Sequence, residues 1–225
     1  PSPEPRPRAS RRLLGRVLYR HPPIGLQPER LHAWLSTLDR TRDVPGAVVE
    51  VGCSVGGTAA WSLRFLENTG TTRRYVCVDT FDGFVPEQFD ADEALGTAAD
   101  KRAMFDGNSL ALATWVVRHH GAPDVELVQG DIITLDPARL PSRIAAALVD
   151  VDLAEPVRVA LERLWPRLQP GGEILVDDCP EDTDWRARHG YRAFVQAHDL
   201  PEHYVNGMGL VTRRRREGTS EDTAG

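Results

Sequence analysis

The sequence predicts an α/β protein built on one doubly wound, mostly parallel sheet. Short apolar runs recur along the chain, and segments with the spacing of amphipathic helices lie between them. Each run is apolar almost throughout, which is typical of parallel strands that helices cover on both faces. With 225 residues and 41% hydrophobic side chains, the chain is long enough to bury one such core without disulfides or structural metals.

The first half of the chain opens with a helix and continues with three expected strands. Apolar side chains recur at helical spacing through residues 28–41, and Pro45-Gly46 ends that helix. Strands are expected at 47–51, 75–79 and 125–129, because these runs are short and largely apolar. A glycine-rich turn and a second helix connect the first two strands.

The second half continues the alternation of strands and helices. Its expected elements are a strand at 144–149, a helix from 156 to about 166, a strand at 173–176, a helix at 191–198, and strands at 204–205 and 209–211. Pro170-Gly171-Gly172 is expected to turn the chain into the strand at 173–176. The last two strands form an antiparallel closing pair, which gives a sheet of seven strands.

Residues 80–108 do not fit this alternation. The segment holds seven acidic residues and four phenylalanines without a clear period. Loops of this length inside a compact domain are usually lids, binding loops or disordered segments. Because phenylalanines stand among the acids, we expect a lid loop over a single domain at 21–212.

The charge is unevenly distributed along the chain. Residues 1–20 carry six arginines and one glutamate, and residues 213–225 carry four arginines and three acids. Since the whole chain carries −6, the body at 21–212 carries −12. We therefore expect a mobile basic arm at 1–20, a disordered tail at 213–225, and a body that does not bind nucleic acid.

Composition also bears on location and assembly. The apolar run at 144–149 is far too short to span a bilayer, so no membrane partner is expected. Cys53, Cys77 and Cys179 have neither the spacing of a metal site nor an even number, which suits a reducing, cytoplasmic location. The helix at 28–41 is expected in the core or in a dimer contact, and a homodimer is the expected assembly.

The turn after the first strand is a candidate cofactor site. It contains Glu50, Gly52, Ser54 and Gly56, with the glycines four residues apart. Glycines here allow a tight turn and a close approach of the backbone to a ligand at a helix N-terminus. The E-x-G-x-x-x-G spacing resembles motif I of S-adenosylmethionine (SAM) methyltransferases, although a purely structural turn has the same composition.

Two further acids stand where a nucleoside would bind. Asp79 ends the second strand, 27 residues after Gly52, and a carboxylate there can accept both ribose hydroxyls. Asp131 follows the third strand and would flank the adenine. The alternative for Asp79 is an exposed acid at a strand end.

The strongest signal is a cluster of carboxylates after the fourth and fifth strands. Asp150 and Asp152 follow one strand, and Asp177 and Asp178 end the next. Neighbouring strands lie about 4.8 Å apart, so the four acids should converge at one sheet edge. Such a cluster requires raised pKa values or a cation, and all-oxygen ligands favour Mg²⁺, with Mn²⁺ or Ca²⁺ as alternatives. Solvated acids at strand ends remain the other interpretation.

Taken together, five segments of the chain resemble the macrocin O-methyltransferase family of Mg²⁺-dependent class I methyltransferases. The resemblance covers about residues 45–212 and is carried by Val48–Thr58, Asp79–Phe84, Asp150-x-Asp152, Leu161–Gly172 and Val176–Asp178. It implies a Rossmann-like fold and methyl transfer from SAM to a sugar hydroxyl. The family usually has a tyrosine soon after the second acid of D-x-D, and this chain has Leu153-Ala154 there.

The resemblance also implies residue roles. The metal would be held by Asp150, Asp177 and Asp178, and SAM would be lined by Glu50, Gly52, Gly56 and Asp79. Asp152 would be the general base: it stands furthest beyond its strand, where the acceptor enters, and Asp150 is expected to lie deeper. A role for Asp152 as a fourth metal ligand stays open, as do a catechol-like acceptor and a non-catalytic nucleotide- or carbohydrate-binding module.

Overall fold

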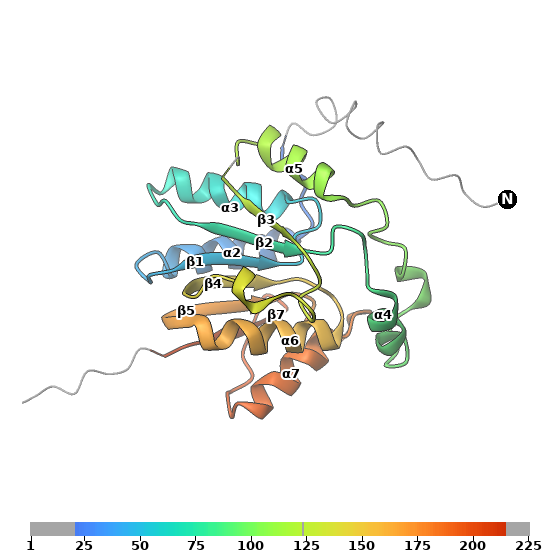
Figure 1. Cartoon of the computed structure of the whole chain (residues 1–225). Coiled ribbons are helices and arrows are strands. Elements are labelled where there is room, and N and C mark those ends of the chain that lie inside the picture. The colour runs from blue at the N-terminus through green and yellow to red at the C-terminus, as the bar shows by residue number, and fades with distance from the viewer. Residues whose placement is uncertain (1–20, 123, 215–225) are drawn as a thin grey trace, which may run out of the picture.

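The computed structural model describes residues 21–122 and 124–214, which form one sheet between two layers of helices (Figure 1). The expected arm at 1–20 and residues 215–225 of the expected tail lie outside the described residues. The strands are β1 (Ala47–Val51), β2 (Tyr75–Asp79), β3 (Glu126–Gln129), β4 (Ile144–Val149), β5 (Leu168–Val176), β6 (Tyr204–Val205) and β7 (Met208–Thr212).

The order of the strands has one switch point, between β1 and β4, where the chain stops adding strands on one side of β1 and continues on the other. Across the sheet the order is β3-β2-β1-β4-β5-β7-β6, and β1 pairs in parallel with both β2 and β4. The final strand β7 runs antiparallel to β5. These pairings confirm the mostly parallel, seven-stranded sheet with an antiparallel closing strand. In an open sheet of this kind, ligands bind outside the carboxyl ends of the strands beside the switch point.

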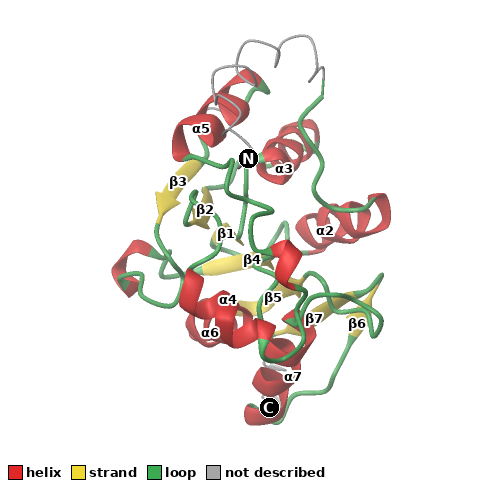
Figure 2. Ribbon diagram, turned by 90° about the vertical axis from the view of Figure 1, so that its right-hand side faces the viewer, coloured by secondary structure: helices red, strands yellow, loops and turns green. Residues whose placement is uncertain are grey.

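Helices cover both faces of the sheet (Figures 1 and 2). The helices with their bounds are α2 (Pro28–Arg40), α3 (Gly57–Asn68), α4 (Pro86–Glu93), α5 (Leu110–His119), α6 (Ala154–Leu164) and α7 (Ala187–Ala197). Apolar side chains of α2, α3 and α5 pack on one face, and those of α6 and α7 on the other. Strands β1 and β4 are therefore buried along their whole length, which explains their continuous apolar runs.

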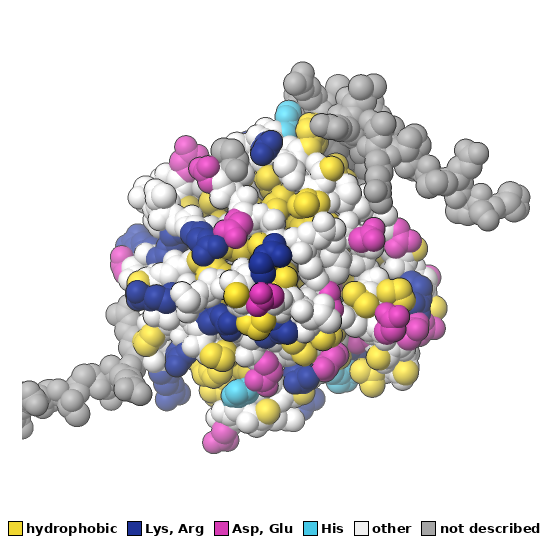
Figure 3. Space-filling view, viewed as in Figure 1, with side chains coloured by type: hydrophobic (Ala, Val, Ile, Leu, Met, Phe, Trp, Pro, Cys, Tyr) yellow, Lys and Arg dark blue, Asp and Glu magenta, His cyan; other side chains and the backbone are white. Residues whose placement is uncertain are grey.

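No helix in the described part of the chain is long and apolar enough to cross a membrane. On the face shown in Figure 3, positive and negative side chains are interspersed. Several of the exposed charges form local pairs, such as Arg158 with Glu155 at 2.6 Å and Arg74 with Glu126 at 2.7 Å. Pairs this exposed contribute little to the free energy of unfolding.

The bounds of β5 and α7 differ from the sequence prediction by several residues, and those of β3, α6 and β7 by one or two. Strand β5 begins at Leu168, because Pro170-Gly171-Gly172 runs within the strand instead of forming a turn before it. The pairing with β4 jumps from Ile144 opposite Leu168 to Ala146 opposite Glu173, so the strand is irregular at this point. Helix α7 begins at Ala187, where the polar first turn hid the helical period.

The segment at 80–108 is more ordered than the loop predicted for it. Helix α4 begins with Pro86, a residue that suits the first turn of a helix. Phe89 of α4 is fully buried and packs in one apolar cluster with Leu153 and Trp185. Asp92 is also buried, and its Oδ1 accepts a hydrogen bond of 2.7 Å from the backbone N–H of Ala154. The segment is therefore fastened to the start of α6.

Strand β1 carries one buried acid. Glu50 is 1% exposed, and its Oε2 accepts a hydrogen bond of 2.7 Å from the Tyr75 hydroxyl. Burial raises the pKa of Glu50 to about 8, which the Tyr75 hydrogen bond opposes and the charge of Asp79 reinforces. The folded protein therefore retains a proton on Glu50 at a pH where an unfolded chain releases it.

Because of this proton, Glu50 makes the free energy of unfolding depend on pH. Between the ordinary pKa of 4.5 and about 8, each pH unit should lower the free energy of unfolding by about 1.4 kcal/mol. Glu50→Gln mimics the protonated acid, so its free energy of unfolding relative to the wild type should rise from pH 5 to pH 8.5. Denaturant unfolding at both pH values measures this difference.

The same substitution at the exposed Glu126 is the control for the change of residue type. A stability difference between Glu50→Gln and the wild type that stays constant from pH 5 to pH 8.5 would contradict the raised pKa.

Candidate active site

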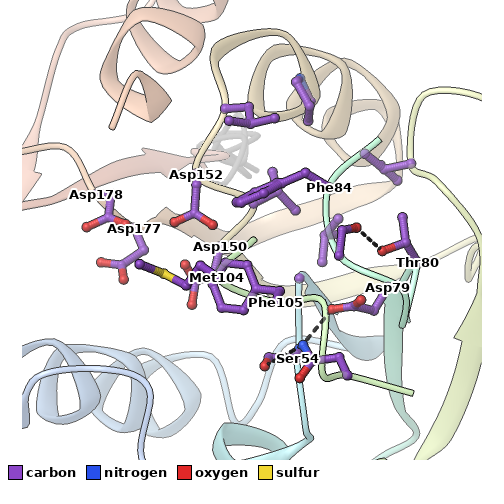
Figure 4. A pocket seen from close by; sticks show the side chains of 18 of the residues that line it. Ser54, Asp79, Thr80, Phe84, Met104, Phe105, Asp150, Asp152, Asp177 and Asp178 are labelled. Carbon is purple, nitrogen blue, oxygen red and sulfur yellow. Dashed lines mark hydrogen bonds between the residues drawn. The ribbon is translucent and has the colours of Figure 1, made fainter. Parts of the chain in front are cut away.

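A cavity of about 350 Å³ opens at the carboxyl ends of the strands on both sides of the switch point. Its volume falls within the range of roughly 300–1,000 Å³ that is typical of small-molecule sites. In the close view of Figure 4, Ser54, Asp79 and Thr80 lie on one side. On the other side stand the four clustered acids: Asp150, Asp152, Asp177 and Asp178.

Gly52 sets the distance between these two sides. It has a φ of +85°, and a Cβ at this position would lie 1.8 Å from the carbonyl oxygen of Asp150. The turn after β1 therefore packs backbone against backbone on the turn after β4, which only glycine permits. The backbone N–H of Asp150 donates to the carbonyl of Val51 at 2.8 Å and continues this contact.

Asp79 is held rigidly at the end of β2. Its Oδ2 accepts a hydrogen bond of 2.8 Å from the backbone N–H of Ser54, and its Oδ1 accepts one of 2.7 Å from Phe81. Burial raises the pKa of Asp79, and these hydrogen bonds to the charged form oppose that rise. Each carboxylate oxygen retains a second lone pair that a ligand in the cavity can use.

Two amide side chains that sequence reasoning missed complete this side. Asn108 is 6% exposed and donates to the Ser54 hydroxyl at 3.0 Å. Gln88 of α4 donates to Oδ2 of Asp131 at 3.0 Å, while the backbone N–H of Ile133 donates to the other oxygen at 2.9 Å. Both amides lie in the long segment at 80–108 and its end, where no local pattern marked them.

Two residues predicted to line the cofactor lie elsewhere. Glu50 points to the opposite side of β1 from Val51 and is enclosed with Tyr75, so it does not line the cavity. Gly56 caps the N-terminus of α3 with a φ of +78°, and a Cβ there would meet Val117 of α5 at 2.6 Å. Packing against α5 therefore explains the glycine at position 56, and the hydrogen bond to Tyr75 of β2 gives the Glu50 carboxyl a buried partner.

The acids after β4 and β5 converge as predicted. Asp150, Asp177 and Asp178 each offer a carboxylate oxygen, and these atoms lie within 4.8 Å of one another. Asp152 points into the same group in Figure 4. The strand ends at Val149, however, and Asp152 has a φ of +61°, so it reaches the cluster through a turn and not by strand alternation.

By exposed fraction, Asp152 is the more enclosed of the two acids after β4, although Asp150 was expected to lie deeper. Asp152 is 8% exposed, whereas Asp150 is only partly buried. Asp152 stands in a left-handed turn between β4 and α6, and the next residue, Leu153, packs against Phe89 of α4. Asp178 has a similar φ of +53°, and aspartate is among the few residues that tolerate this conformation.

Burial and mutual repulsion raise the pKa values of the cluster. The pKa of Asp150 lies well above its usual range, mainly because of burial and then because of Asp177 and Asp152. Burial and the charge of Asp178 raise the pKa of Asp152 in the same way. Burial and Asp178 raise the pKa of Asp177 to about 6, and the positive charge of Arg30 opposes them.

Arg30 is the main site residue that sequence reasoning missed. It comes from α2, and its Nη1 donates to Oδ1 of Asp177 at 2.9 Å and to Oδ1 of Asp178 at 2.8 Å. The sequence did contain a signal, since Arg30 stands in the stripe of α2 that continues through Ala33, Trp34 and Leu38. An arginine in an apolar stripe indicates a buried partner for its charge.

The three clustered carboxylates suit a hard divalent cation. They supply only oxygen ligands from adjacent strand ends, without histidine or cysteine, which is the donor set that Mg²⁺ and Mn²⁺ prefer. A cation there would also relieve the repulsion that raises the pKa values of these acids.

The cavity also has an apolar wall. Phe84 packs against Phe105 and Trp185 with ring centroids 5.3 Å and 5.8 Å apart, and Met104 lies beside them. The sequence marked the phenylalanines but not Trp185, which lies between β5 and α7. The cavity therefore has an apolar, largely aromatic surface as well as a charged one.

Comparisons with known proteins agree with this geometry. A model of the methyltransferase domain family matches residues 49–179. The chain is 32% identical over 217 residues to 8-demethyl-8-(2,3-dimethoxy-α-L-rhamnosyl)-tetracenomycin-C 4'-O-methyltransferase of Streptomyces olivaceus, covering 92% of this chain and 81% of that one. It is 29% identical over 160 residues to mycinamicin III 3''-O-methyltransferase of Micromonospora griseorubida, covering 65% and 63%.

Among solved structures, the O-methyltransferase NovP superposes with a TM-score of 0.73 at 20% identity, covering 83% of this chain and 80% of that one. This likeness confirms the fold. The family match and the first of the two relatives cover most of the described domain and include both strand ends that carry the acids. The chain therefore belongs to the methyltransferase domain family and is a SAM-dependent O-methyltransferase, as the resemblance to the macrocin O-methyltransferases implied.

Proposed function

We propose that the enzyme transfers the SAM methyl group to a hydroxyl of a sugar and requires Mg²⁺ or Mn²⁺ held by Asp150, Asp177 and Asp178. The observation that carries this proposal is the convergence of these carboxylates in the cavity that also contains Gly52 and Asp79. The name of the Streptomyces olivaceus relative, which describes methylation of a rhamnosyl compound, supports a sugar acceptor.

The donor would bind along the β1–β2 side of the cavity. Gly52 brings the backbone close to the ligand, and Asp79 accepts hydrogen bonds from the two ribose hydroxyls. Ser54 and Asp131 lie at the two flanks of that position and are available to the rest of the nucleoside. The methyl group would then point toward β4, where the acids stand.

The acceptor would bind between the acids and the apolar wall. A divalent cation bound there lowers the pKa of a ligated hydroxyl. Asp152 lies beside the three-carboxylate group and accepts the hydroxyl proton as the oxygen attacks the methyl carbon and the sulfonium–carbon bond breaks. Asp150, Asp177 and Asp178 keep the acceptor in line for this displacement.

The segment at 80–108 is proposed as the lid of this site. It contributes Phe84, Gln88, Met104 and Phe105 to the cavity wall, so its closure would exclude water from the transferring methyl. Its attachment to Ala154 through Asp92 places any movement of the segment next to the proposed base.

A catechol-like small molecule is the second candidate acceptor. Two neighbouring phenolic oxygens could ligate the same cation, and the rings of Phe84, Phe105 and Trp185 offer aromatic contacts to the ring of such an acceptor. Transfer of labelled methyl groups to a panel of rhamnosides, other glycosides and catechols should give product with at least one glycoside. Product with catechols alone would replace the sugar proposal by this one.

Removing the cation or one of its ligands should abolish most of the activity. A lost Lewis acid costs several kcal/mol in the transition state, so EDTA or Asp177→Ala should lower kcat by about 10²–10³-fold. The dissociation constant for SAM, measured by calorimetry, should change little, because Asp79 and Gly52 are untouched. Full turnover in EDTA would rule out the metal.

Replacing Asp152 should separate the role of base from that of ligand. Asp152→Asn keeps a residue that tolerates the left-handed backbone, and it should lower kcat by about 10²–10⁴-fold without weakening Mn²⁺ binding. Asp178→Asn, at the other acid of the cluster with a left-handed backbone, is the matched variant of a ligand and should be partly rescued by excess Mn²⁺. Equal rescue of Asp152→Asn would make Asp152 a fourth ligand.

A further inference from the structure

Arg30 occupies an unusual position beside the acid cluster. It is 9% exposed, and one nitrogen of its guanidinium contacts both Asp177 and Asp178. Among the described residues that line the cavity, it is the only basic one. Four carboxylates therefore share one positive side chain, which leaves the group with excess negative charge when all four are ionised.

The surrounding structure holds Arg30 in place from two sides. Its helix α2 is anchored in the core by Trp34, which is fully buried. The turn between β6 and β7 packs over the side chain, since a Cβ at Gly207 would lie 3.8 Å from the Arg30 Nε. Asn206 in this turn donates to the backbone carbonyl of Glu29 at 3.0 Å. These contacts restrict the movement of the guanidinium, so we expect it to leave the acids only when another positive charge takes its place.

The contacts of Arg30 overlap with those of the proposed cation. The same carboxylates, Asp177 and Asp178, are two of the three that would ligate it. A divalent cation between them would lie close to the guanidinium, and like charges at such separation repel strongly inside a protein. The guanidinium and the cation would therefore compete for the same carboxylate oxygens of Asp177 and Asp178.

We propose that Arg30 is a built-in counter-ion of the metal site, which holds Asp177 and Asp178 together while no cation is bound and which an entering cation must displace. This inference rests on the proposed metal site. It assigns Arg30 two opposite effects: it stabilises the metal-free protein, and it weakens the binding of the cation.

Arg30→Met tests both effects, because methionine fills much of the same space without charge. In EDTA its thermal midpoint should lie several degrees below that of the wild type. Calorimetric titration of the metal-free protein with Mn²⁺ at pH 8.5 should show binding that is roughly tenfold tighter than wild type. Arg30→Gln, which keeps one N–H donor, should change both quantities in the same directions and serves if the methionine variant does not fold.

Arg40→Met is the matched control, since Arg40 lies on the same helix, is half exposed and pairs with Glu173 away from the cavity. It should bind Mn²⁺ like the wild type. If Arg30→Met and Arg30→Gln bind Mn²⁺ more weakly than the wild type, Arg30 supports the bound cation and the counter-ion role is wrong. If wild type and all variants fail to bind Mn²⁺, the proposed metal site itself is lost, and this inference is lost with it.

Discussion

The gathering of four carboxylates at one sheet edge is the constraint on which the rest of the structure depends. The backbone pairing of β4 with β5 fixes Val149 opposite Val176, and the acids follow directly after these residues. Asp150 and Asp177 cannot move apart without breaking backbone hydrogen bonds to neighbouring strands, and Asp152 and Asp178 stand beside them in left-handed turns, so the repulsion and burial of the four acids must be balanced locally. Arg30 provides one balancing charge, and the raised pKa of Asp177 shows that this balance is incomplete.

The surrounding elements keep this group rigid. Strands β1 and β4 are buried on both faces, which places the ends of the sheet in a frame of close-packed side chains. Helix α6 begins two residues after Asp152, so the partial positive charge of its N-terminus lies near this acid. Asp92 caps the same helix from α4 and ties the long segment at 80–108 to the frame.

Much of the fold could be predicted because the strands end sharply. The bounds of β1, β2 and β4 follow from apolar runs that stop at a glycine or an acid. The acid cluster followed from the parallel sheet, which brings the residues after neighbouring strands to one edge. Strand β5 was harder, because Pro170-Gly171-Gly172 has the composition of a turn and only the pairing with β4 shows that it is a strand.

The residues that could not be predicted act across large separations in sequence. Arg30 and Asp178 are 148 positions apart, and Asp92 and Ala154 are 62 apart. A local pattern does not indicate such partners, although Arg30 interrupts an apolar stripe and Pro86 marks the start of α4. Glu50 shows the opposite case: a familiar spacing suggested a cofactor contact, but strand alternation placed its side chain against Tyr75.

The contact between Gly52 and Asp150 has a consequence for how such an enzyme can diversify. Because the two turns touch through backbone atoms, the offset between the β1–β2 side of the cavity and the acids depends on strand spacing and not on side-chain rotamers. Phe84, Met104 and Trp185 belong to segments outside this contact. Substitutions of Phe84, Met104 or Trp185 therefore reshape the apolar wall without changing this offset, so the proposed acceptor preference and the proposed transfer geometry can be altered independently of each other.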